Sequence, residues 1–300
     1  MGQAMSELLL REGTIRAMLP EHGRRISILT PSYNQVEYIE QNIRSVIRQD
    51  YPNSEHIVID GGSTDGTLAI LKKYPHLRWI SERDRGQADA LNKGLAMATG
   101  EIVGWINSDD YYADNIFHDV AREFASADVH WVVGNITILL EETGEKLAQR
   151  SPAPTYENLI KNPGIVRQQA TFFCKNTVED VGGWNPDLYM VMDYDLWLRL
   201  AKKLPPKMVD TNWAYYRIHR DQKTSRRNIL REAREIDRIL STEGVSSARR
   251  RQFMIKKHIY ALKAMIKEVL VESGVIDADY RNMPLSMRRE LRAQGGTRCR

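Results

Sequence analysis

Four short apolar runs alternate with helix-like segments over residues 25–106, and this alternation limits the possible folds more than any other feature of the chain. The runs "RISILT", "EHIVID", "LRWIS" and "EIVGWI" have the length and composition of buried strands. The segments between them carry apolar residues at helical spacing, as in Ile39, Ile43, Val46 and Ile47 after a possible Asn34 cap. Strands separated in this way predict βαβ units, and hence an α/β fold with a mainly parallel central sheet and flanking helices.

Polar residues follow each of these four strands at the point where the strand ends. The groups are Thr30–Asn34, Asp60–Asp65, Asp84–Gln87 and Asn107–Asp110. The carboxyl ends of parallel strands lie at one edge of the sheet, where open α/β sheets bind their ligands. Capping of the next helix explains one such group but is a poor explanation for four. We therefore expect a ligand site at this edge.

The residue types at this edge indicate a phosphate ligand that is carried by a metal ion. The first crossover has no G-x-G-x-x-G turn, and the chain has no G-x-x-x-x-G-K-[ST] loop, which argues against a dinucleotide-binding dehydrogenase and a P-loop NTPase. Mg²⁺ and Mn²⁺ bind one or two protein carboxylates together with phosphate oxygens. Such a cation would also relieve the repulsion between the adjacent Asp109 and Asp110.

Two long stretches resemble the family 2 glycosyltransferases, which have the GT-A fold. "TPSYNQVEYIEQNIRSVIRQDYPNSEHIVIDGGSTDGT" resembles the nucleotide-binding opening of that family, and "SERDRGQADALNKGLAMATGEIVGWINSDD" resembles the stretch that ends in its D-x-D metal motif. The resemblance covers residues 25–220. It implies an inverting transfer of a sugar from a nucleotide-diphospho-sugar, a UDP-sugar, to a saccharide or lipid-linked saccharide. The implied setting is polysaccharide or cell-surface glycan biosynthesis, and the implied cofactor is Mn²⁺ or Mg²⁺.

The same resemblance assigns roles to residues in the first half of the chain. It implies that Pro31, Tyr33 and Asn34 line the nucleoside pocket. Asp60 would hydrogen-bond the base or ribose, and Asp84 would border the diphosphate.

The D-x-D motif departs from the family pattern at its first position. The matched triplet reads Asn107, Ser108 and Asp109, and Asp110 follows it. An amide oxygen at Asn107 can accept a hydrogen bond from ribose or from metal-bound water but adds no charge; capping of a helix that begins near Asp114 is the alternative. We therefore place the metal contact on Asp109 and give Asp110 a supporting role.

The second half of the domain is expected to bind the acceptor. "HWVVGNITILLEETGEKLAQR" predicts two strands joined by a turn, and "GIVRQQATFFCK" predicts an apolar strand behind a glutamine pair. In "YMVMDYDLWLRLAKK", Asp193 matches the family's "ED" region ahead of a "WLRL" helix, with Met192 in place of the glutamate. The resemblance makes Asp193 the general base; Asp195 is the competing candidate and otherwise the N-cap of that helix.

Two further residues have open alternatives. His219 matches a position from which relatives of this fold offer a histidine to the metal or diphosphate, but a single histidine is equally compatible with a structural role. Trp184 follows a glycine pair and is suited either to stacking on an acceptor sugar or to core packing.

The predicted organisation has three parts. Residues 1–24 form an N-terminal helical segment, residues 25–220 the GT-A domain, divided at 112 into nucleotide- and acceptor-binding halves, and residues 221–300 a basic helical extension. The helices of the extension either pack on the domain or lie against an anionic membrane. The formal charge of +4 gives no reason to expect nucleic acid binding.

The chain has two cysteines, without metal-ligand spacing, and lacks an apolar run long enough to span a bilayer. These features predict a cytoplasmic protein that can bind peripherally to the inner face of the cell membrane. Two other functions stay open at this point. A catalytically silent sugar-nucleotide binding module would not need Asp193, and a nucleotidyltransferase would carry a Gly-rich basic loop where this chain has "TPSYNQ".

Overall fold

The computed structural model describes residues 23–163, 167–219, 222–224 and 228–272. The predicted N-terminal helical segment lies outside them, apart from its last two residues. The chain divides into two compact units: one runs to Ile138 and continues over Lys146–Tyr216, and the other comprises Leu139–Glu145 and the chain from Arg217 onward. All four strand-end groups belong to the first unit.

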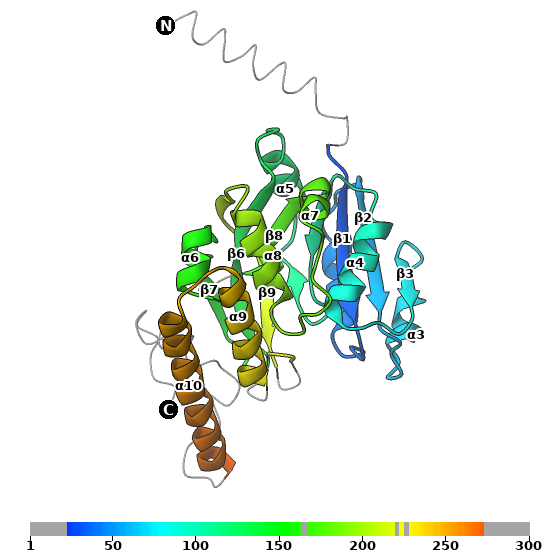
Figure 1. Cartoon of the computed structure of the whole chain (residues 1–300). Helices are drawn as coiled ribbons and strands as arrows, with labels where there is room; N and C mark the ends of the chain where they lie inside the picture. Colours follow the sequence, from blue (N-terminus) through cyan, green and yellow to red (C-terminus); the bar gives the residue numbers. More distant parts are fainter. Residues whose placement is uncertain (1–22, 164–166, 220–221, 225–227, 273–300) are drawn as a thin grey trace, which may run out of the picture. The chain divides into compact units, whose positions relative to one another are not determined.

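A mixed β-sheet forms the centre of the first unit (Figure 1). Among the described residues its strand order is β3-β2-β1-β4-β8-β6-β9-β5, and β7 pairs with β6. The strands are β1 (Ile26–Ser32), β2 (Ser54–Asp60), β3 (Arg78–Ser81), β4 (Ile102–Trp105), β5 (Tyr111–Tyr112), β6 (Trp131–Leu140), β7 (Lys146–Gln149), β8 (Thr171–Cys174) and β9 (Lys207–Ile218).

The helices alternate with these strands in the first half of the chain and cluster after β7. They are α2 (Ile39–Ile47), α3 (Thr67–Leu71), α4 (Gln87–Met97), α5 (Phe117–Glu123), α6 (Tyr156–Lys161), α7 (Lys175–Asp180), α8 (Met192–Ala201), α9 (Ile229–Thr242) and α10 (Ser247–Glu272), with a 3₁₀ turn at Gln168–Ala170.

The four predicted strands form the parallel half of the sheet, as expected. β1 is central and lies parallel to both β2 and β4, so that Leu29 is opposite Ile57 on one side and Trp105 on the other. β3 extends the parallel set beyond β2. Every residue of β1 is buried, because helices such as α4 cover the sheet (Figure 1), and this explains its continuous apolar run.

The other half of the sheet is antiparallel and is built from later segments. β8 lies antiparallel to β4, with Phe173 opposite Val103, and β6 lies antiparallel to β8. The short β5 pairs with β9 through Tyr111 and Tyr215, whose rings stack with centroids 4.6 Å apart. The predicted hairpin of β6 and β7 and the predicted strand β8 are confirmed.

One local prediction is wrong. Asn34 does not cap α2, whose N-cap is Tyr38, and Ile47, the last residue of the same helix, is 48% exposed. The C-cap of α4 is Ala98. Two residues later, glycine at 100 leaves space for the strand beside it, because a Cβ there would lie 2.6 Å from the Ser27 hydroxyl oxygen.

In the second unit, α9 and α10 form a helical pair. Two ion pairs join them, Lys257 to Glu232 at 2.7 Å and Arg250 to Asp237 at 3.3 Å. A third ion pair, at 2.7 Å, holds the nearly buried Arg217 against Glu141. Within the described residues, no helix has the length and apolar character required to cross a bilayer.

Candidate active site

The loops after β1 and β2 are bound to each other through Asn34. Its backbone N–H donates to the Ser63 hydroxyl at 2.7 Å, and its side-chain oxygen accepts the backbone N–H of Thr64 at 2.9 Å. Asn34 has a φ of 52°, in the left-handed region that asparagine tolerates better than most residues. This conformation turns the loop back toward the end of β2.

Asp60, the last residue of β2, is fully buried. Its carboxylate accepts the backbone N–H groups of Gly62 and Ser63, at 3.0 and 2.9 Å, and the hydroxyls of Ser63 and Ser81, at 2.5 and 2.7 Å. In this structure Asp60 therefore holds its own loop in place. A direct bond from Asp60 to a base or ribose stays a prediction.

Tyr33 and Asp84 converge on Gly61. A Cβ on Gly61 would lie 2.8 Å from an Asp84 carboxylate oxygen and 3.4 Å from the Tyr33 ring, so a larger residue here would push the Asp84 carboxylate aside. The Tyr33 side chain is 61% exposed and presents an aromatic face to solvent, whereas Pro31 is buried within β1. An exposed ring beside a carboxylate suits a nucleoside, whose base can stack on the ring.

Asp84 is a partly buried carboxylate near other acidic residues. Burial raises the pKa of its carboxyl above the ordinary value, and the nearby Asp89 and Asp60 act in the same direction against the Gly86 N–H and Lys93. A raised carboxyl pKa in a cluster of acids marks a site that a cation would stabilise.

Asn107 has a different role from the one expected. Its side-chain oxygen accepts two hydrogen bonds, from Gln87 Nε2 at 2.6 Å and from Trp105 Nε1 at 2.9 Å. The indole N–H is only a donor, so this geometry identifies the amide oxygen as the acceptor. What Asn107 offers a ligand is therefore its NH₂ group. The alternative of a helix cap is wrong, because α5 begins at Phe117 after Ile116, without a side-chain cap.

The next three residues differ in exposure. Ser108 and Asp110 are buried, at 4% and 1%, whereas Asp109 is half-buried. The Asp110 carboxylate accepts a hydrogen bond of 2.9 Å from Gln169, in the 3₁₀ turn before β8. This position is compatible with a supporting role for Asp110, and Asp109 is the less buried of the two carboxylates.

A chain of buried polar side chains supports the Asn107–Asp110 loop. Asn42 of α2 donates from its amide nitrogen to the backbone carbonyls of Asn107 and Asp110, both at 2.9 Å. Its oxygen faces the Thr30 hydroxyl, which lies 2.9 Å from His56 Nε2. Burial lowers the pKa of His56 to about 3, so this ring is neutral at physiological pH. The helical spacing around Asn42 gave no sign of this role, because it depends on contacts 65 and 68 residues away.

Asp193 and Asp195 both lie in the first turn of α8, which begins at Met192 rather than after Asp195. The predicted N-cap role of Asp195 is therefore wrong. Asp195 forms an ion pair with Arg199 through two hydrogen bonds of 2.9 and 2.7 Å. The Arg199 guanidinium also donates to the carbonyls of Val181 and Gly183. Asp195 thus anchors the loop that precedes α8, while Asp193 is half-buried and accepts the Tyr194 N–H at 2.8 Å.

Aromatic packing brings α8 to the end of β4. Trp105 is in edge-on contact with Trp184 and Trp197, with ring centroids 5.6 and 6.5 Å apart. The Asn92 side chain of α4 donates a hydrogen bond to the backbone carbonyl of Trp184 and accepts one from the backbone N–H of the same residue. Trp184 is fully buried, so its alternative role as a stacking surface for the acceptor sugar is wrong and core packing is correct.

The donor set at this edge fits a divalent metal ion. Within the described ranges no cluster of three His, Cys, Asp or Glu side chains is arranged as a complete ligand set. Mg²⁺ and Mn²⁺ need no such set when substrate phosphates and water supply the other ligands. Asp109, half-buried just after β4, is a carboxylate of the kind such an ion binds. His219 is buried in the second unit, where its backbone N–H donates to Gln222 at 3.1 Å, and its role as a metal ligand stays a prediction.

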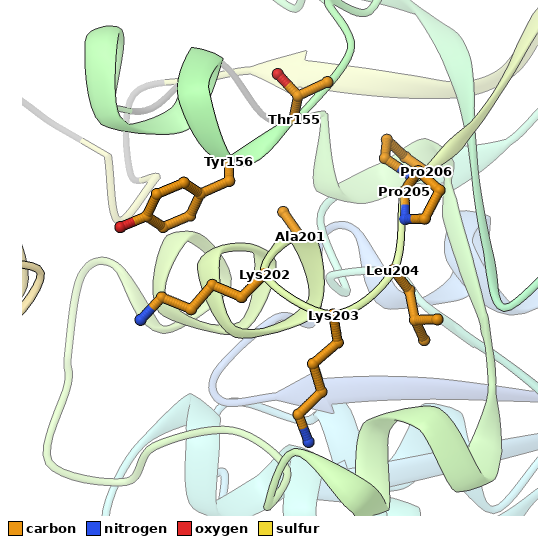
Figure 2. Close-up of a pocket in the computed structure, with 8 residues that line it drawn as sticks. All are labelled: Thr155, Tyr156, Ala201, Lys202, Lys203, Leu204, Pro205 and Pro206. Atoms are coloured by element: carbon orange, nitrogen blue, oxygen red, sulfur yellow. The ribbon is translucent and has the colours of Figure 1, made fainter.

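A separate small cavity of about 190 Å³ lies between the start of α6 and the end of α8 (Figure 2). Its lining includes Thr155, Tyr156 and the turn formed by residues 202–206. The Lys202 ammonium nitrogen lies 5.7 Å from the centroid of the Tyr156 ring. Because Asp193 is at the opposite end of α8, this cavity is distinct from the strand-end cluster.

Comparison with known proteins decides the family. The model of "Glycosyl transferase family 2" matches residues 27–178, just over half of the chain and all four strand-end groups. The chain belongs to glycosyl transferase family 2. The strand-end cluster is therefore the candidate active site of a transferase, and the resemblance noted in the sequence is confirmed.

Relatives of this glycosyltransferase include proteins of polysaccharide synthesis. An uncharacterized glycosyltransferase of Mycobacterium tuberculosis is 30% identical over 189 residues, which cover 60% of this chain and 70% of the relative. Chondroitin synthase of Escherichia coli is 25% identical over 208 residues, which cover 67% of this chain but only 30% of that protein.

Two solved structures support the GT-A fold of this glycosyltransferase. S. aureus TarS 1-349, in complex with UDP-GlcNAc, has a TM-score of 0.58 and 20% identity, covering 79% of this chain and 72% of TarS 1-349. The mannosyltransferase PcManGT from Pyrobaculum calidifontis, in complex with GDP-Man and Mn²⁺, has a TM-score of 0.58 and 18% identity, with 92% and 86% of the two chains covered. The predicted fold class is thus confirmed.

Proposed function

We propose that this glycosyltransferase moves a sugar from a nucleotide-diphospho-sugar, a UDP-sugar, to a hydroxyl group of a saccharide or lipid-linked saccharide, with inversion at the anomeric carbon. One observation carries the proposal: two carboxylates with separate surroundings belong to elements that meet at the end of β4. Asp109 follows β4 itself, and Asp193 lies in the first turn of α8, which packs on Trp105 of the same strand.

The donor is held by the strand-end loops. Tyr33 offers an exposed ring for the base, and Pro31 and Asn34 shape the loop that presents it. Asp60 sets the backbone of the facing loop, and Asp84 borders the diphosphate. The NH₂ group of Asn107 is a donor suited to a ribose or phosphate oxygen, with Ser108 and Asp110 buried beneath.

The transfer step needs a base. The acceptor hydroxyl oxygen attacks the anomeric carbon from the face opposite the diphosphate, and the bond from that carbon to the diphosphate oxygen breaks as the new C–O bond forms. The hydroxyl proton passes to a carboxylate within hydrogen-bond reach, and we assign this role to Asp193. Asp195 is less suited because Arg199 already engages it at 2.7 Å.

A Mn²⁺ or Mg²⁺ ion on Asp109 supplies charge stabilisation to the departing diphosphate when it is bound. The ion in the PcManGT complex supports this choice of cofactor. Burial, with smaller contributions from Asp89 and Asp60, raises the pKa of Asp84, and a bound cation would favour its ionised form. His219 is proposed as a further contact for the metal or the diphosphate.

The setting we propose is polysaccharide or cell-surface glycan synthesis in the cytoplasm, at the inner face of the membrane when the acceptor is lipid-linked. The relationship to chondroitin synthase supports the first part of this proposal. A uridine donor is supported by the TarS complex with UDP-GlcNAc, whereas the PcManGT complex contains GDP-Man, so the base must be tested directly.

The experiment is a thermal-shift panel of UDP, GDP and TDP sugars, each with and without Mn²⁺. A ligand that binds only the folded state raises the unfolding temperature in proportion to the logarithm of its concentration over Kd. We expect a UDP-sugar to give the largest shift, and only with the metal present. A larger shift with a GDP-sugar would identify guanosine, rather than uridine, as the nucleoside of the donor. The proposed function would be contradicted if none of the sugar nucleotides gave a metal-dependent shift.

A further inference from the structure

The outward side of α10 carries an apolar stripe that the structure leaves exposed. Ile255, Ile259, Leu262 and Met265 are 54%, 49%, 57% and 64% exposed. The first three are spaced four and three residues apart, so they lie on one face of the helix. Such a stripe is the residue pattern of a contact surface rather than of a solvated helix face.

The stripe is not the side of α10 that packs on α9. The residues toward α9 are half-buried and include Lys257 and Arg250, which pair with acidic residues of α9. At 100° per residue, Lys257 points about 160° away from Ile255 on the helix surface. One side of α10 therefore binds α9, and the opposite side presents the stripe.

Basic residues lie beside the apolar stripe and within it. At 100° per residue, Lys256 and Lys263 lie along one border of the stripe, and Arg251 lies between Leu262 and Met265, all three exposed. From 247 to 267 the sequence has seven Lys and Arg residues and no Asp or Glu. The outward side of α10 thus combines apolar and positively charged side chains without any acidic residue.

We propose that this outward side of α10 binds the surface of an anionic phospholipid bilayer, with the apolar stripe at the boundary of the acyl chains and the neighbouring Arg and Lys side chains on the lipid phosphates. An interfacial helix buries its apolar side in this way, and each basic residue near an anionic leaflet strengthens binding. A second copy of the same surface would place basic residues against basic residues. An anionic bilayer satisfies both the apolar and the charged part.

The test is co-sedimentation of the full-length protein with vesicles of phosphatidylglycerol and phosphatidylcholine, compared with vesicles of phosphatidylcholine alone. We expect binding to the anionic vesicles only, and release at high salt because screening weakens the charge attraction. Equal binding to both vesicle types, or to neither, overturns the proposal.

Two double variants separate the parts of the surface. Lys256→Glu with Lys263→Glu should weaken binding to the anionic vesicles by at least about 10-fold, because each basic residue near an anionic leaflet increases the binding constant several-fold. The matched control is Lys72→Glu with Lys73→Glu, which makes the same charge change on exposed lysines after α3 and should leave binding within about 2-fold of wild type, since those lysines lie outside the contact. Circular dichroism and unfolding temperatures check that each variant is folded.

Ile255→Gln with Ile259→Gln tests the apolar stripe without altering charge. We expect it also to lose binding to the anionic vesicles. Binding that persists would reduce the contact to charge attraction alone and overturn the proposal. A wild type that binds no vesicles and sediments as a dimer, with the isoleucine variant monomeric, would identify a second copy as the occupant. A monomer that binds no vesicles would indicate that the stripe is covered by the chain itself. None of these outcomes depends on the donor or on transfer activity.

Discussion

Asn42 donates a hydrogen bond of 2.9 Å to the backbone carbonyl of Asp110, and this bond connects the middle of α2 to the end of the motif that is expected to bind the metal. The same amide nitrogen reaches the Asn107 carbonyl at the other end of the motif. Asp109 lies between these two points. The loop that carries the metal carboxylate is therefore held at both ends by one buried side chain.

Asn42→Ala should weaken this loop. Removing the amide takes one donor from the Asp110 carbonyl and one from the Asn107 carbonyl, which keeps the Asp110 backbone N–H at 3.0 Å. Losing a buried hydrogen-bond donor costs about 1–3 kcal/mol. We expect a loss of about 2 kcal/mol in the free energy of unfolding, measured in urea, together with weaker metal-dependent donor binding. The control Asn158→Ala removes a similar amide-to-carbonyl bond at α6 and should leave donor affinity unchanged. Equal donor affinity in both variants would contradict a positioning role for Asn42.

Asp109→Asn tests the metal assignment. The substitution removes the charge but keeps the size of the side chain, so the fold should persist while metal-dependent nucleotide binding is lost. Calorimetric titration of UDP with and without Mn²⁺ measures this directly. Asp128→Asn changes an exposed aspartate after α5 and serves as the matched control. Undiminished Mn²⁺ dependence in Asp109→Asn would show that the metal contact lies elsewhere.

Asp193→Asn should separate binding from chemistry. If its carboxylate touches only the acceptor hydroxyl, donor and metal should bind nearly as in wild type, while single-turnover transfer falls by roughly 10²–10⁴ as expected for a lost general base. Near-normal transfer by this variant would remove Asp193 from the chemistry.

Asp195→Asn provides the comparison for that experiment. Losing the charge breaks the ion pair with Arg199 and loosens the loop before α8, so stability should fall by about 1 kcal/mol with a smaller loss of rate per folded molecule. If transfer is lost here and retained in Asp193→Asn, then the base is Asp195. If both variants stay active, this region is not catalytic.

The stability of the enzyme should fall in mild acid because of His56. In the folded protein the pKa of His56 is lowered to about 3, so the ring stays neutral down to about that pH. In the unfolded chain the ring has its ordinary pKa of 6.5 and takes up a proton below that pH. The unfolded state therefore binds more protons between these limits, so stability is fully present above pH 6.5 and is lost as pH falls. One proton corresponds to a slope of about 1.4 kcal/mol per pH unit.

Urea unfolding of wild type and His56→Gln between pH 7.5 and 4.5 measures this slope. Glutamine can keep a hydrogen bond to Thr30 but does not titrate in this range. The variant should show a shallower slope than wild type, whatever its stability at neutral pH. Identical slopes would mean that His56 is not held neutral by its burial.

The sequence by itself determined the parallel half of the sheet, the order of the strand-end groups and the family. These features are local: the composition of β1 and the helical spacing of Ile39 and Ile43 depend on which side of a segment is buried, and that periodicity is written in neighbouring residues. The edge at which ligands bind then follows from the direction of parallel strands.

Only the tertiary structure decided how the side chains at that edge are used. Asn107 is oriented by Gln87, 20 residues away, and Asp110 is bound by Gln169, 59 residues away. Polar side chains pair with whichever partner the fold brings within about 3 Å, and no local pattern encodes a partner from a distant segment. The pairing of Asp195 with Arg199 is local, four residues apart, but it depends on where α8 begins: with the first turn at Met192, Asp195 lies inside the helix and one turn from Arg199.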